Sequence, residues 1–153
     1  MKRILLVEDN PNDIELALGA LAAETYAENI IVAKDGQYAL DFLYSSGQHL
    51  MREPGNPILI MLDLKLPRVD GLEVLRRVKA DPVLKHIPVV MFTGSGEESD
   101  LHTSYGLGVN AYVVKPVDFS EYAAALKMIG RFWTQINQAP PVLALTKGGG
   151  GKQ

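Results

Sequence analysis

The sequence predicts an α/β domain built on a doubly wound, five-stranded parallel sheet. Three observations lead to this fold class: five short apolar runs rich in β-branched residues, no alternation of polar and apolar residues within those runs, and helical spacing in the segments between them. A continuous apolar run is typical of a strand that is buried on both faces of a parallel sheet. Strands that alternate with helices in one compact domain imply right-handed crossovers.

The five apolar runs predict the strands. Each run is bounded by Gly, Pro, Asp or Asn, the residues that typically end strands. In chain order the predicted strands are residues 4–7, 30–33, 58–62, 89–92 and 111–114.

A helix is predicted after each strand. The first predicted helix has apolar residues at positions i, i+3, i+4 and i+7, namely Ile14, Ala17, Leu18 and Leu21. It follows Asn10 and Pro11, which are suited to capping and to the first helical turn. Leu72, Leu75 and Val78 have similar spacing after the third strand. Patterns that resemble capping boxes predict further helix starts at Asp70, Ser95 and Asp118.

Composition limits the classes of function. The 153 residues suit one domain, with 47% hydrophobic and 22% charged residues. The absence of cysteine excludes disulfides, thiolate metal sites and cysteine nucleophiles. A net charge of −3 disfavours nucleic-acid binding. We expect a soluble, cytoplasmic protein without a membrane span, because no apolar run approaches the roughly 18 residues that a span requires.

Domain boundaries follow from the same pass along the chain. We expect one domain over residues 1–138, with a longer polar loop at 47–57 before the third strand. Residues 139–153, which contain two prolines and then four glycines, are expected to form a flexible tail. This tail is too short for an output domain.

Polar residues follow four of the predicted strands and should converge. Glu8 and Asp9 follow the first strand, Asp63 the third, Thr93 the fourth and Lys115 the fifth. Ligand sites in such sheets lie at the carboxyl ends of the strands. Crowded carboxylates need a cation, and hard oxygen ligands favour Mg²⁺. With Lys115 and Thr93 beside them, the group is suited to a phosphoryl group carried on a carboxylate.

Each of these residues also has an ordinary structural interpretation. An acidic pair after a strand often caps a helix, a threonine there is usually a turn residue, and a single lysine is usually solvated. Asp63 is different, because an unpaired charge directly after a buried strand is costly. The order of all four signals along the chain favours a single pocket.

Five motifs resemble those of bacterial response-regulator receiver domains over about residues 2–138. They are Val7-Glu8-Asp9-Asn10, Leu62 to Pro67, Asp70-Gly71, Phe92-Thr93-Gly94, and Tyr112 to Pro116. The resemblance implies a flavodoxin-like (βα)5 fold with strand order 2-1-3-4-5. Less specific features of the sequence include the long loop before the third strand and Phe132-Trp133. In these features the chain is most similar to single-domain receivers paired with bacterial and cyanobacterial phytochromes.

The resemblance implies a role for each motif residue. Asp63 would accept a phosphoryl group from a sensor histidine kinase, and the narrower resemblance implies that this kinase is a phytochrome. Asp63 would bind Mg²⁺ together with Glu8, Asp9 and the carbonyl of Lys65. Lys115, Thr93 and the backbone N–H of Gly94 would hold the phosphoryl oxygens.

The resemblance also implies features around this site. Tyr112 would be the aromatic switch that moves with Thr93, or a ring that only covers the sheet edge. The Lys115–Pro116 peptide bond would be cis. Lys65 and Ser95 would modulate hydrolysis, because they flank the path of the attacking water.

The last helix has more apolar surface than one face requires. Two stripes run along it, and we expect one of them to form a homodimer interface together with the last strand. The candidate interface residues are Tyr122, Phe132 and Trp133. The alternative is that the flanking loop and tail bury both stripes.

Two other functions are compatible with a strand-end aspartate or a doubly wound sheet. A haloacid-dehalogenase-type phosphatase or phosphotransferase also uses such an aspartate with Mg²⁺, but it needs a second Asp where this chain has Lys65. A flavodoxin-like flavin carrier needs a phosphate-binding loop after the first strand, where Glu8 and Asp9 would repel phosphate. We therefore favour a receiver that is not an enzyme beyond its own phosphorylation and dephosphorylation.

Overall fold

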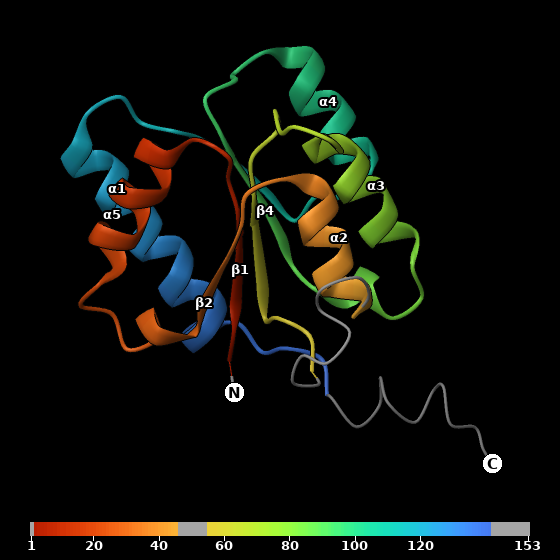
Figure 1. Ribbon diagram of the computed structural model, residues 1–153, viewed down its shortest axis with the longest axis horizontal. Coiled ribbons are helices and arrows are strands. Elements are labelled where there is room, and N and C mark those ends of the chain that lie inside the picture. The colour runs from red at the N-terminus through yellow and green to blue at the C-terminus, as the bar shows by residue number, and fades with distance from the viewer. Residues whose placement is uncertain (1, 46–54, 142–153) are drawn as a thin grey trace.

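The computed structural model describes residues 2–45 and 55–141, which form a parallel sheet between two layers of helices (Figure 1). Within these residues the sheet has five strands in the order β2-β1-β3-β4-β5, which confirms the predicted fold class and strand order. The strands are β1 (Ile4–Val7), β2 (Ile30–Ala33), β3 (Leu59–Leu62), β4 (Val89–Thr93) and β5 (Ala111–Val114). Their bounds differ from the predicted ranges by one residue at most.

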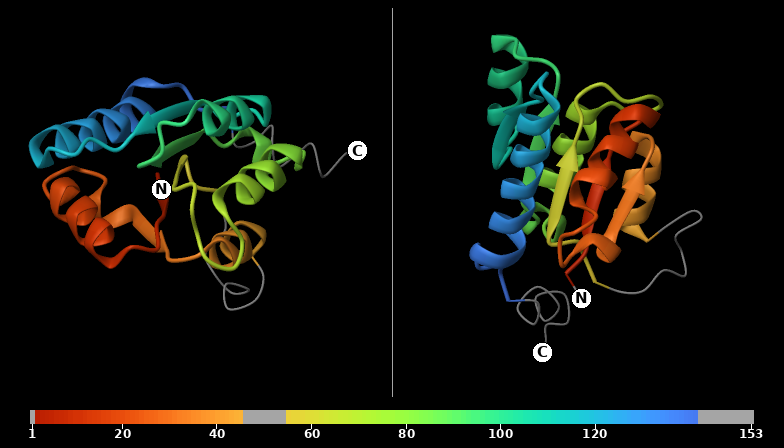
Figure 2. Two further views of the ribbon diagram at one scale, coloured as in Figure 1. Left: turned by 90° about the horizontal axis from the view of Figure 1, so that it is seen from above. Right: turned by 90° about the vertical axis from the view of Figure 1, so that its left-hand side faces the viewer.

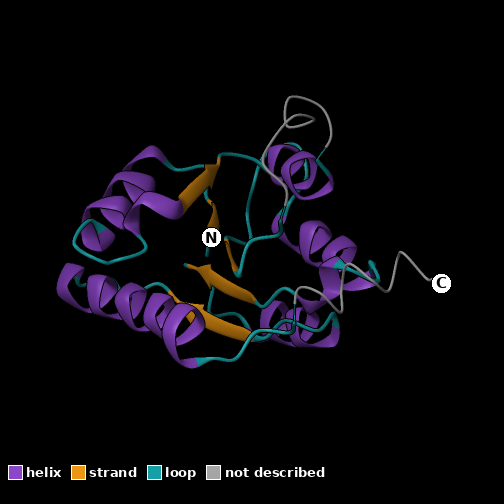
Figure 3. Cartoon of the chain, turned by 90° about the horizontal axis from the view of Figure 1, so that it is seen from below, coloured by secondary structure: helices purple, strands orange, loops and turns teal. Residues whose placement is uncertain are grey.

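Helices cover both faces of the sheet (Figure 3). The helices are α1 (Pro11–Leu21), α2 (Gly36–Tyr44), α3 (Gly71–Ala80), α4 (Glu98–Gly106) and α5 (Phe119–Arg131). Shorter helical turns are η1 (Ala27–Asn29), η3 (Leu84–His86) and the π-helical turn η4 (Phe132–Ile136), which continues α5. Helices α1 and α5 pack together on one face, and α2, α3 and α4 lie on the other (Figure 1).

The sheet separates two hydrophobic cores. Leu5 and Ile60 point into the core beneath α2 and α3, whereas Leu6 and Met61 point into the core beneath α1 and α5. Alternate residues of the central strands are therefore buried on opposite faces, which explains why their apolar runs are continuous. The edge strands β2 and β5 are only partly buried, so full burial on both faces applies to β1, β3 and β4.

Most of the predicted helix caps are confirmed. The side chains of Asn10, Asp70 and Asp118 accept hydrogen bonds from backbone N–H groups in the first turns of α1, α3 and α5. The predicted cap at Ser95 is wrong, because α4 begins at Glu98 with Glu97 at its N-cap position. The Ser95 hydroxyl instead donates to Asp100 Oδ2 at 2.5 Å.

The parallel strands bring their carboxyl ends to one edge of the sheet. In Figure 1 the N-terminus lies at the opposite edge, and Figure 2 shows β1, β2 and β3 running in the same direction. The chain leaves each strand there and enters a helix, so the residues of these connections meet above the sheet.

Gly71 allows one of these connections to be tight. A Cβ atom on Gly71 would lie 2.1 Å from the carbonyl oxygen of Asp63, and the Gly71 N–H donates to the carbonyl of Leu64 at 2.8 Å. A residue with a side chain would force the start of α3 away from the end of β3. Gly71 therefore fixes the backbone that follows Asp63.

Two predicted segments lie largely outside the described residues. Most of the polar loop predicted at 47–57 belongs to the range 46–54, and most of the tail predicted at 139–153 belongs to the range 142–153. Among the helices of the described ranges, none combines the length and the apolar character needed to cross a membrane.

Candidate functional site

Three carboxylates meet at the carboxyl edge of the sheet. Glu8 and Asp9 come from the connection after β1, and Asp63 comes directly after β3. One oxygen from each of these three side chains lies within 4.8 Å of the other two. Carboxylate oxygens at this spacing are suited to a hard divalent cation such as Mg²⁺.

Lys115, directly after β5, extends its ammonium group into this cluster. Its Nζ lies 2.7 Å from Glu8 Oε1 and 3.0 Å from Asp63 Oδ2. The Lys115 and Asp63 side chains each have 12% of their surface exposed, and that of Glu8 has 5%. The cluster is therefore largely shielded from water, which strengthens its electrostatic interactions.

Asp13 is a fourth carboxylate at the site, and our sequence analysis did not identify it. Its Oδ2 lies 2.8 Å from Lys115 Nζ. Asp13 is in the first turn of α1, where an acidic residue is common because it interacts favourably with the helix dipole. One feature of the sequence could have indicated it. Asp13 lies in the first turn of the helix that starts at the sheet edge carrying Glu8 and Asp9.

Burial and charge act in opposite ways on the pKa values of this cluster. Burial raises the pKa of Glu8 to about 7, helped by the charge of Asp63 and opposed by the hydrogen bond from Lys115. For Lys115, burial alone would lower the pKa. Hydrogen bonds to Asp13 and Glu8 and the charge of Asp63 outweigh burial, and the pKa lies above its ordinary value. Lys115 therefore remains charged at neutral pH.

The carboxylate of Asp63 is held by both of its oxygens. Oδ1 accepts a hydrogen bond from the backbone N–H of Leu64 at 2.7 Å, and Oδ2 accepts one from Lys115. The Glu8 carboxylate is held similarly, since its Oε2 accepts from the N–H of Asn10 at 3.1 Å. Asp63 is thus oriented before any ligand arrives.

Thr93 and Gly94 lie at the carboxyl end of β4, the strand next to the one that Asp63 follows. Thr93 ends β4 and is 2% exposed, and its Oγ1 lies 3.5 Å from the backbone nitrogen of Ser95, which donates to it. Gly94 follows directly on the exposed connection to α4. Both residues therefore lie where the prediction placed them, at the end of the strand next to β3.

Tyr112 lies on β5 beside this connection. Its hydroxyl donates to the backbone carbonyl of Ser95 at 2.8 Å, and its partly buried ring packs against the core on the α2 and α3 face. Burial raises its pKa, although the hydrogen bond to Ser95 opposes that rise. The ring is thus tied to the connection that carries Thr93, and its role as a switch stays a prediction.

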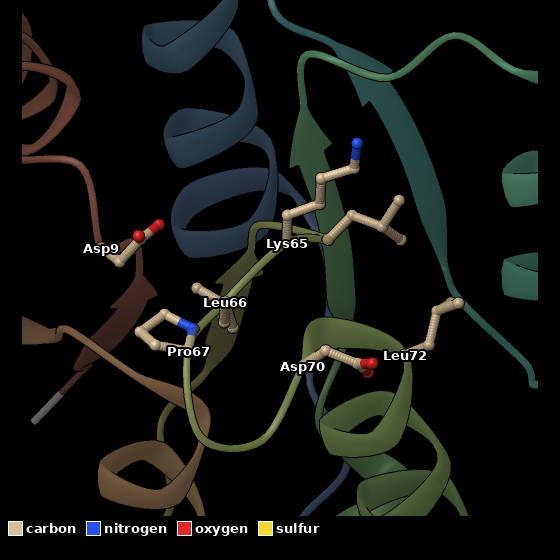
Figure 4. A pocket seen from close by; sticks show the side chains of 7 residues that line it. Asp9, Lys65, Leu66, Pro67, Asp70 and Leu72 are labelled. Atoms are coloured by element: carbon tan, nitrogen blue, oxygen red, sulfur yellow. The ribbon is translucent and has the colours of Figure 1, made fainter.

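An open depression of about 490 Å³ lies next to the acidic cluster (Figure 4). Its lining includes Asp9, Lys65, Leu66, Asp70 and Leu72. Figure 4 shows the exposed Lys65 side chain extending away from Asp70. Lys65 therefore lies at the mouth of the site, and its predicted effect on hydrolysis is not decided by its position.

The predicted cis peptide bond before Pro116 is wrong. In residues 2–45 and 55–141 no peptide bond is cis, so the Lys115–Pro116 bond is trans. The trans form of a bond before proline is favoured by about 0.5–1 kcal/mol. Lys115 reaches the carboxylates from this trans backbone.

The predicted interface residues have different environments. Tyr122 is 6% exposed and packs in the core beneath α1 and α5, so its assignment to the interface is wrong. Trp133 is partly buried against the same core, and its ring meets that of Phe132 edge-on at 4.9 Å. Phe132 is exposed, as are Met128 and Ile136. The outer surface of α5 and η4 therefore carries apolar side chains.

The family comparison agrees with this geometry. Residues 4–127 match the family model described as response regulator receiver domain. The response regulator Rcp1 of Synechocystis sp. is 39% identical over 139 residues, which cover 91% of this chain and 93% of Rcp1. Nearly the full length of that relative is therefore matched.

Solved structures are similar over the same length. The phosphorylated cyanobacterial phytochrome response regulator RcpA is 41% identical with a TM-score of 0.85, covering 92% of this chain and 99% of RcpA. The Mn²⁺-bound form of Rcp1 also has a TM-score of 0.85, with 39% identity over 92% of this chain and 100% of Rcp1. The bacteriophytochrome response regulator AtBRR is 53% identical with a TM-score of 0.72, covering 90% of this chain and 99% of AtBRR.

Proposed function

This chain belongs to the response regulator receiver domain family of two-component signalling, and from that premise we propose that it is switched by phosphorylation of Asp63. The observation that carries the proposal is the contact of Lys115 Nζ with Asp63 Oδ2 at 3.0 Å, in a cluster that also holds Glu8 and Asp9. A nucleophilic carboxylate, a fixed cation and a set of metal ligands are what phosphoryl transfer to an aspartate requires.

In the transfer step, an oxygen of Asp63 attacks the phosphorus of a phosphohistidine on a sensor kinase. The new O–P bond forms as the N–P bond breaks, and the imidazole nitrogen keeps the electron pair. Lys115 neutralises an oxygen of the arriving phosphoryl group, and the Thr93 hydroxyl and the Gly94 N–H donate to the others. The chain is thus a receiver that promotes only its own phosphorylation and dephosphorylation.

The donor set of the site fits a divalent metal ion. Glu8, Asp9 and Asp63 supply three carboxylate oxygens, and the backbone carbonyl of Lys65 is proposed as a further ligand. Mg²⁺ is the ion we propose, because hard oxygen ligands select it. When bound, it would neutralise negative charge on the phosphoryl oxygens during transfer.

We propose a phytochrome-type sensor histidine kinase as the partner. The support is the similarity to RcpA, whose structure is described as that of a phosphorylated cyanobacterial phytochrome response regulator, and to AtBRR, a bacteriophytochrome response regulator. Phosphotransfer from a panel of purified histidine kinases tests the pairing. Faster transfer from a kinase without a phytochrome input region would contradict it.

Homodimer formation through α5, η4 and β5 is the second part of the proposal. Its support is the exposed apolar surface of Met128, Phe132 and Ile136 on α5 and η4, and Val114 on β5 is a further exposed apolar residue. Adjacent exposed apolar side chains of this kind are typical of contact surfaces between proteins. A cytoplasmic location and the receiver boundary at residue 138 stay predictions.

Asp63→Asn tests the acceptor directly. The amide keeps the size of the side chain but is not a nucleophile, so we expect no phosphorylation by acetyl phosphate in the presence of Mg²⁺. Intact-mass spectrometry measures the gain of one phosphoryl group. The control is Glu15→Gln, which removes an exposed carboxylate on α1 and should be phosphorylated at the wild-type rate. A phosphoryl group gained by Asp63→Asn at that same rate would refute the assignment.

A further inference from the structure

Lys115 has more carboxylate partners than phosphoryl transfer alone requires. An ammonium group has three N–H donors. In the described part of the chain these meet Glu8 at 2.7 Å, Asp13 at 2.8 Å and Asp63 at 3.0 Å. Every donor is therefore occupied before a phosphoryl group arrives.

The three partners of Lys115 differ in what else they can do. Glu8 and Asp63 belong, with Asp9, to the cluster whose oxygens could hold a cation, whereas Asp13 does not belong to it. A bound cation would compete for the oxygens of Glu8 and Asp63 and would repel the ammonium group of Lys115. Asp13 would then be the partner that still attracts Lys115.

Two hydrogen bonds anchor the backbone of Asp13, so that its side chain can stay directed at Lys115. Its backbone N–H donates to Asn10 Oδ1 at 3.1 Å within the cap of α1, and its carbonyl accepts from the Tyr122 hydroxyl of α5 at 3.3 Å. Its side chain is 30% exposed, against 12% for that of Lys115. Asp13 therefore reaches Lys115 from the solvent side on a backbone anchored to two helices.

An aromatic ring also lies near the ammonium group of Lys115. The Phe92 ring centroid lies 6.0 Å from Lys115 Nζ, and the Phe92 ring packs against that of Tyr122 at 5.4 Å. The ring of Phe92 itself can offer only a weak interaction to a lysine that has lost a carboxylate, because it carries no hydrogen-bonding group. The position of the ammonium group thus depends on its carboxylates.

We propose that Asp13 is a positioning residue that keeps the ammonium group of Lys115 directed at the phosphoryl position on Asp63 while Glu8 and Asp63 bind the metal. Asp13 itself touches neither the metal nor the phosphoryl group. The inference rests on the proposed function, since it concerns how the same site holds a phosphoryl group.

Affinity for a phosphoryl analogue tests this role without a reaction. Calorimetric titration with trifluoroberyllate at saturating Mg²⁺ measures how well the site holds a phosphoryl-like group. For Asp13→Asn we expect affinity to fall by roughly threefold to tenfold, the size expected for one weakened charge-assisted hydrogen bond. Glu15→Gln, which removes a carboxylate from an exposed position of the same helix, should leave the affinity unchanged.

A double-mutant cycle with Lys115→Met separates positioning from a general structural effect. If Asp13 acts through Lys115, adding Asp13→Asn to Lys115→Met should change the affinity by less than about twofold. An equal loss in both backgrounds would overturn the proposal. Circular dichroism melts of all variants show whether the fold is retained, and Asp13→Ala replaces Asp13→Asn if the latter is unfolded.

Metal affinity gives an independent readout. Calorimetric titration with Mg²⁺ alone should show Asp13→Asn within about threefold of wild type, because Asp13 lies outside the ligand cluster and its side chain bonds to Lys115 instead of a ligand. A loss as large as that of Asp9→Asn would make Asp13 a metal ligand and overturn the proposal. If wild type itself did not bind trifluoroberyllate, the proposed function would fail with it. Wild-type binding that Asp13→Asn leaves unchanged would refute only the role of Asp13.

Discussion

At the scale of single residues, the acceptor site depends on how buried charges are balanced. Lys115 is surrounded by Glu8, Asp13 and Asp63, and its hydrogen bonds to them outweigh the cost of burying its charge. Removing Lys115 would leave carboxylates without their counterion. We therefore expect the lysine to contribute to folding as well as to the proposed phosphoryl binding.

The raised pKa of Glu8 predicts how stability changes with pH in the metal-free protein. Burial raises this pKa from 4.5 to about 7, so the folded state binds a proton more tightly than the unfolded state. The stability from this group is present below about pH 4.5 and is lost as pH rises toward 7. Urea unfolding of wild type with a chelator should show this loss.

Glu8→Gln is the control for that titration, since an amide does not titrate. The difference in unfolding free energy between wild type and Glu8→Gln should shift in favour of the variant between pH 5 and pH 8, a window that brackets the pKa of about 7. A constant difference across this range would show that Glu8 does not titrate there.

Lys65 predicts the lifetime of the phosphoryl group. Its exposed side chain stands at the mouth of the site, where it can shield the phosphoryl group from an attacking water. Extra positive charge would favour hydrolysis, but Lys115 and the metal ion already neutralise the oxygens. Lys65→Ala should therefore speed dephosphorylation by roughly threefold to tenfold, equivalent to about 0.7–1.4 kcal/mol of barrier.

Loss of radiolabelled phosphate from purified phosphoprotein measures this rate. Lys34→Ala is the control, because it removes an exposed lysine from the connection after β2. An unchanged or longer lifetime in Lys65→Ala would show that the side chain does not shield the phosphoryl group.

At the scale of elements, Gly71 determines how closely α3 approaches β3. Gly71→Ala would bring a Cβ atom to 2.1 Å from the carbonyl oxygen of Asp63, which requires the backbone to shift. We expect a loss of more than about 2 kcal/mol in unfolding free energy. Slower phosphorylation should accompany it, because the shift moves the segment that carries Asp63.

Gly19→Ala is the matched control in α1. A Cβ atom there meets nothing within 4 Å, so the change should stabilise the protein by about 0.5–1 kcal/mol through helix propensity alone. Urea unfolding compares the two variants. Equal effects of both changes would mean that the contact between Gly71 and Asp63 is not limiting.

The sequence predicted the elements well where local signals coincide with the tertiary structure. The bounds of β1, β2 and β5 match the predicted ranges, and Asn10, Asp70 and Asp118 act as caps. The cap predicted at Ser95 was wrong: the sequence there resembles a capping box, but the side chain bonds to Asp100 instead. Which partner the Ser95 side chain bonds depends on where α4 lies, and the local sequence pattern does not contain that information.

In the candidate site too, the residues with a local sequence signal were predicted, and those that depend on tertiary packing were not. Glu8, Asp9, Asp63 and Lys115 were predicted to converge because each follows a strand of a parallel sheet. Asp13 was missed because it lies inside a helix, and the sequence does not show that this position of α1 faces Lys115. Tyr122 was misassigned because helical spacing does not tell which apolar stripe faces the sheet.

At the scale of the whole molecule, the exposed apolar surface of α5 and η4 predicts self-association. Phe132→Glu places a charge in that surface, so a dimer should shift to monomer at roughly tens of micromolar. Leu16→Glu is the control, because Leu16 on α1 is 42% exposed and Phe132 is 43% exposed. Sedimentation velocity measures both variants.

Two outcomes of this sedimentation experiment would contradict the predicted dimer interface. A wild-type protein that sediments as a monomer at this concentration would remove the dimer from the proposed function. Dissociation by both Phe132→Glu and Leu16→Glu would place the interface elsewhere. Trp133→Ala is a weaker probe, since Trp133 also packs against the core and its loss would destabilise the fold.

The four carboxylates of the site, Glu8, Asp9, Asp13 and Asp63, also affect which phosphoryl donors can reach Asp63. Small phosphorylated metabolites are anions, and a pocket in which carboxylates outnumber ammonium groups repels them. A kinase can overcome this repulsion by holding its phosphohistidine against the receiver surface, whereas a freely diffusing metabolite has no such contact and depends on Mg²⁺ to offset the repulsion. The acidic cluster would thus reduce phosphorylation of Asp63 by small metabolites relative to phosphorylation by the kinase. The magnesium concentration would set the size of that reduction.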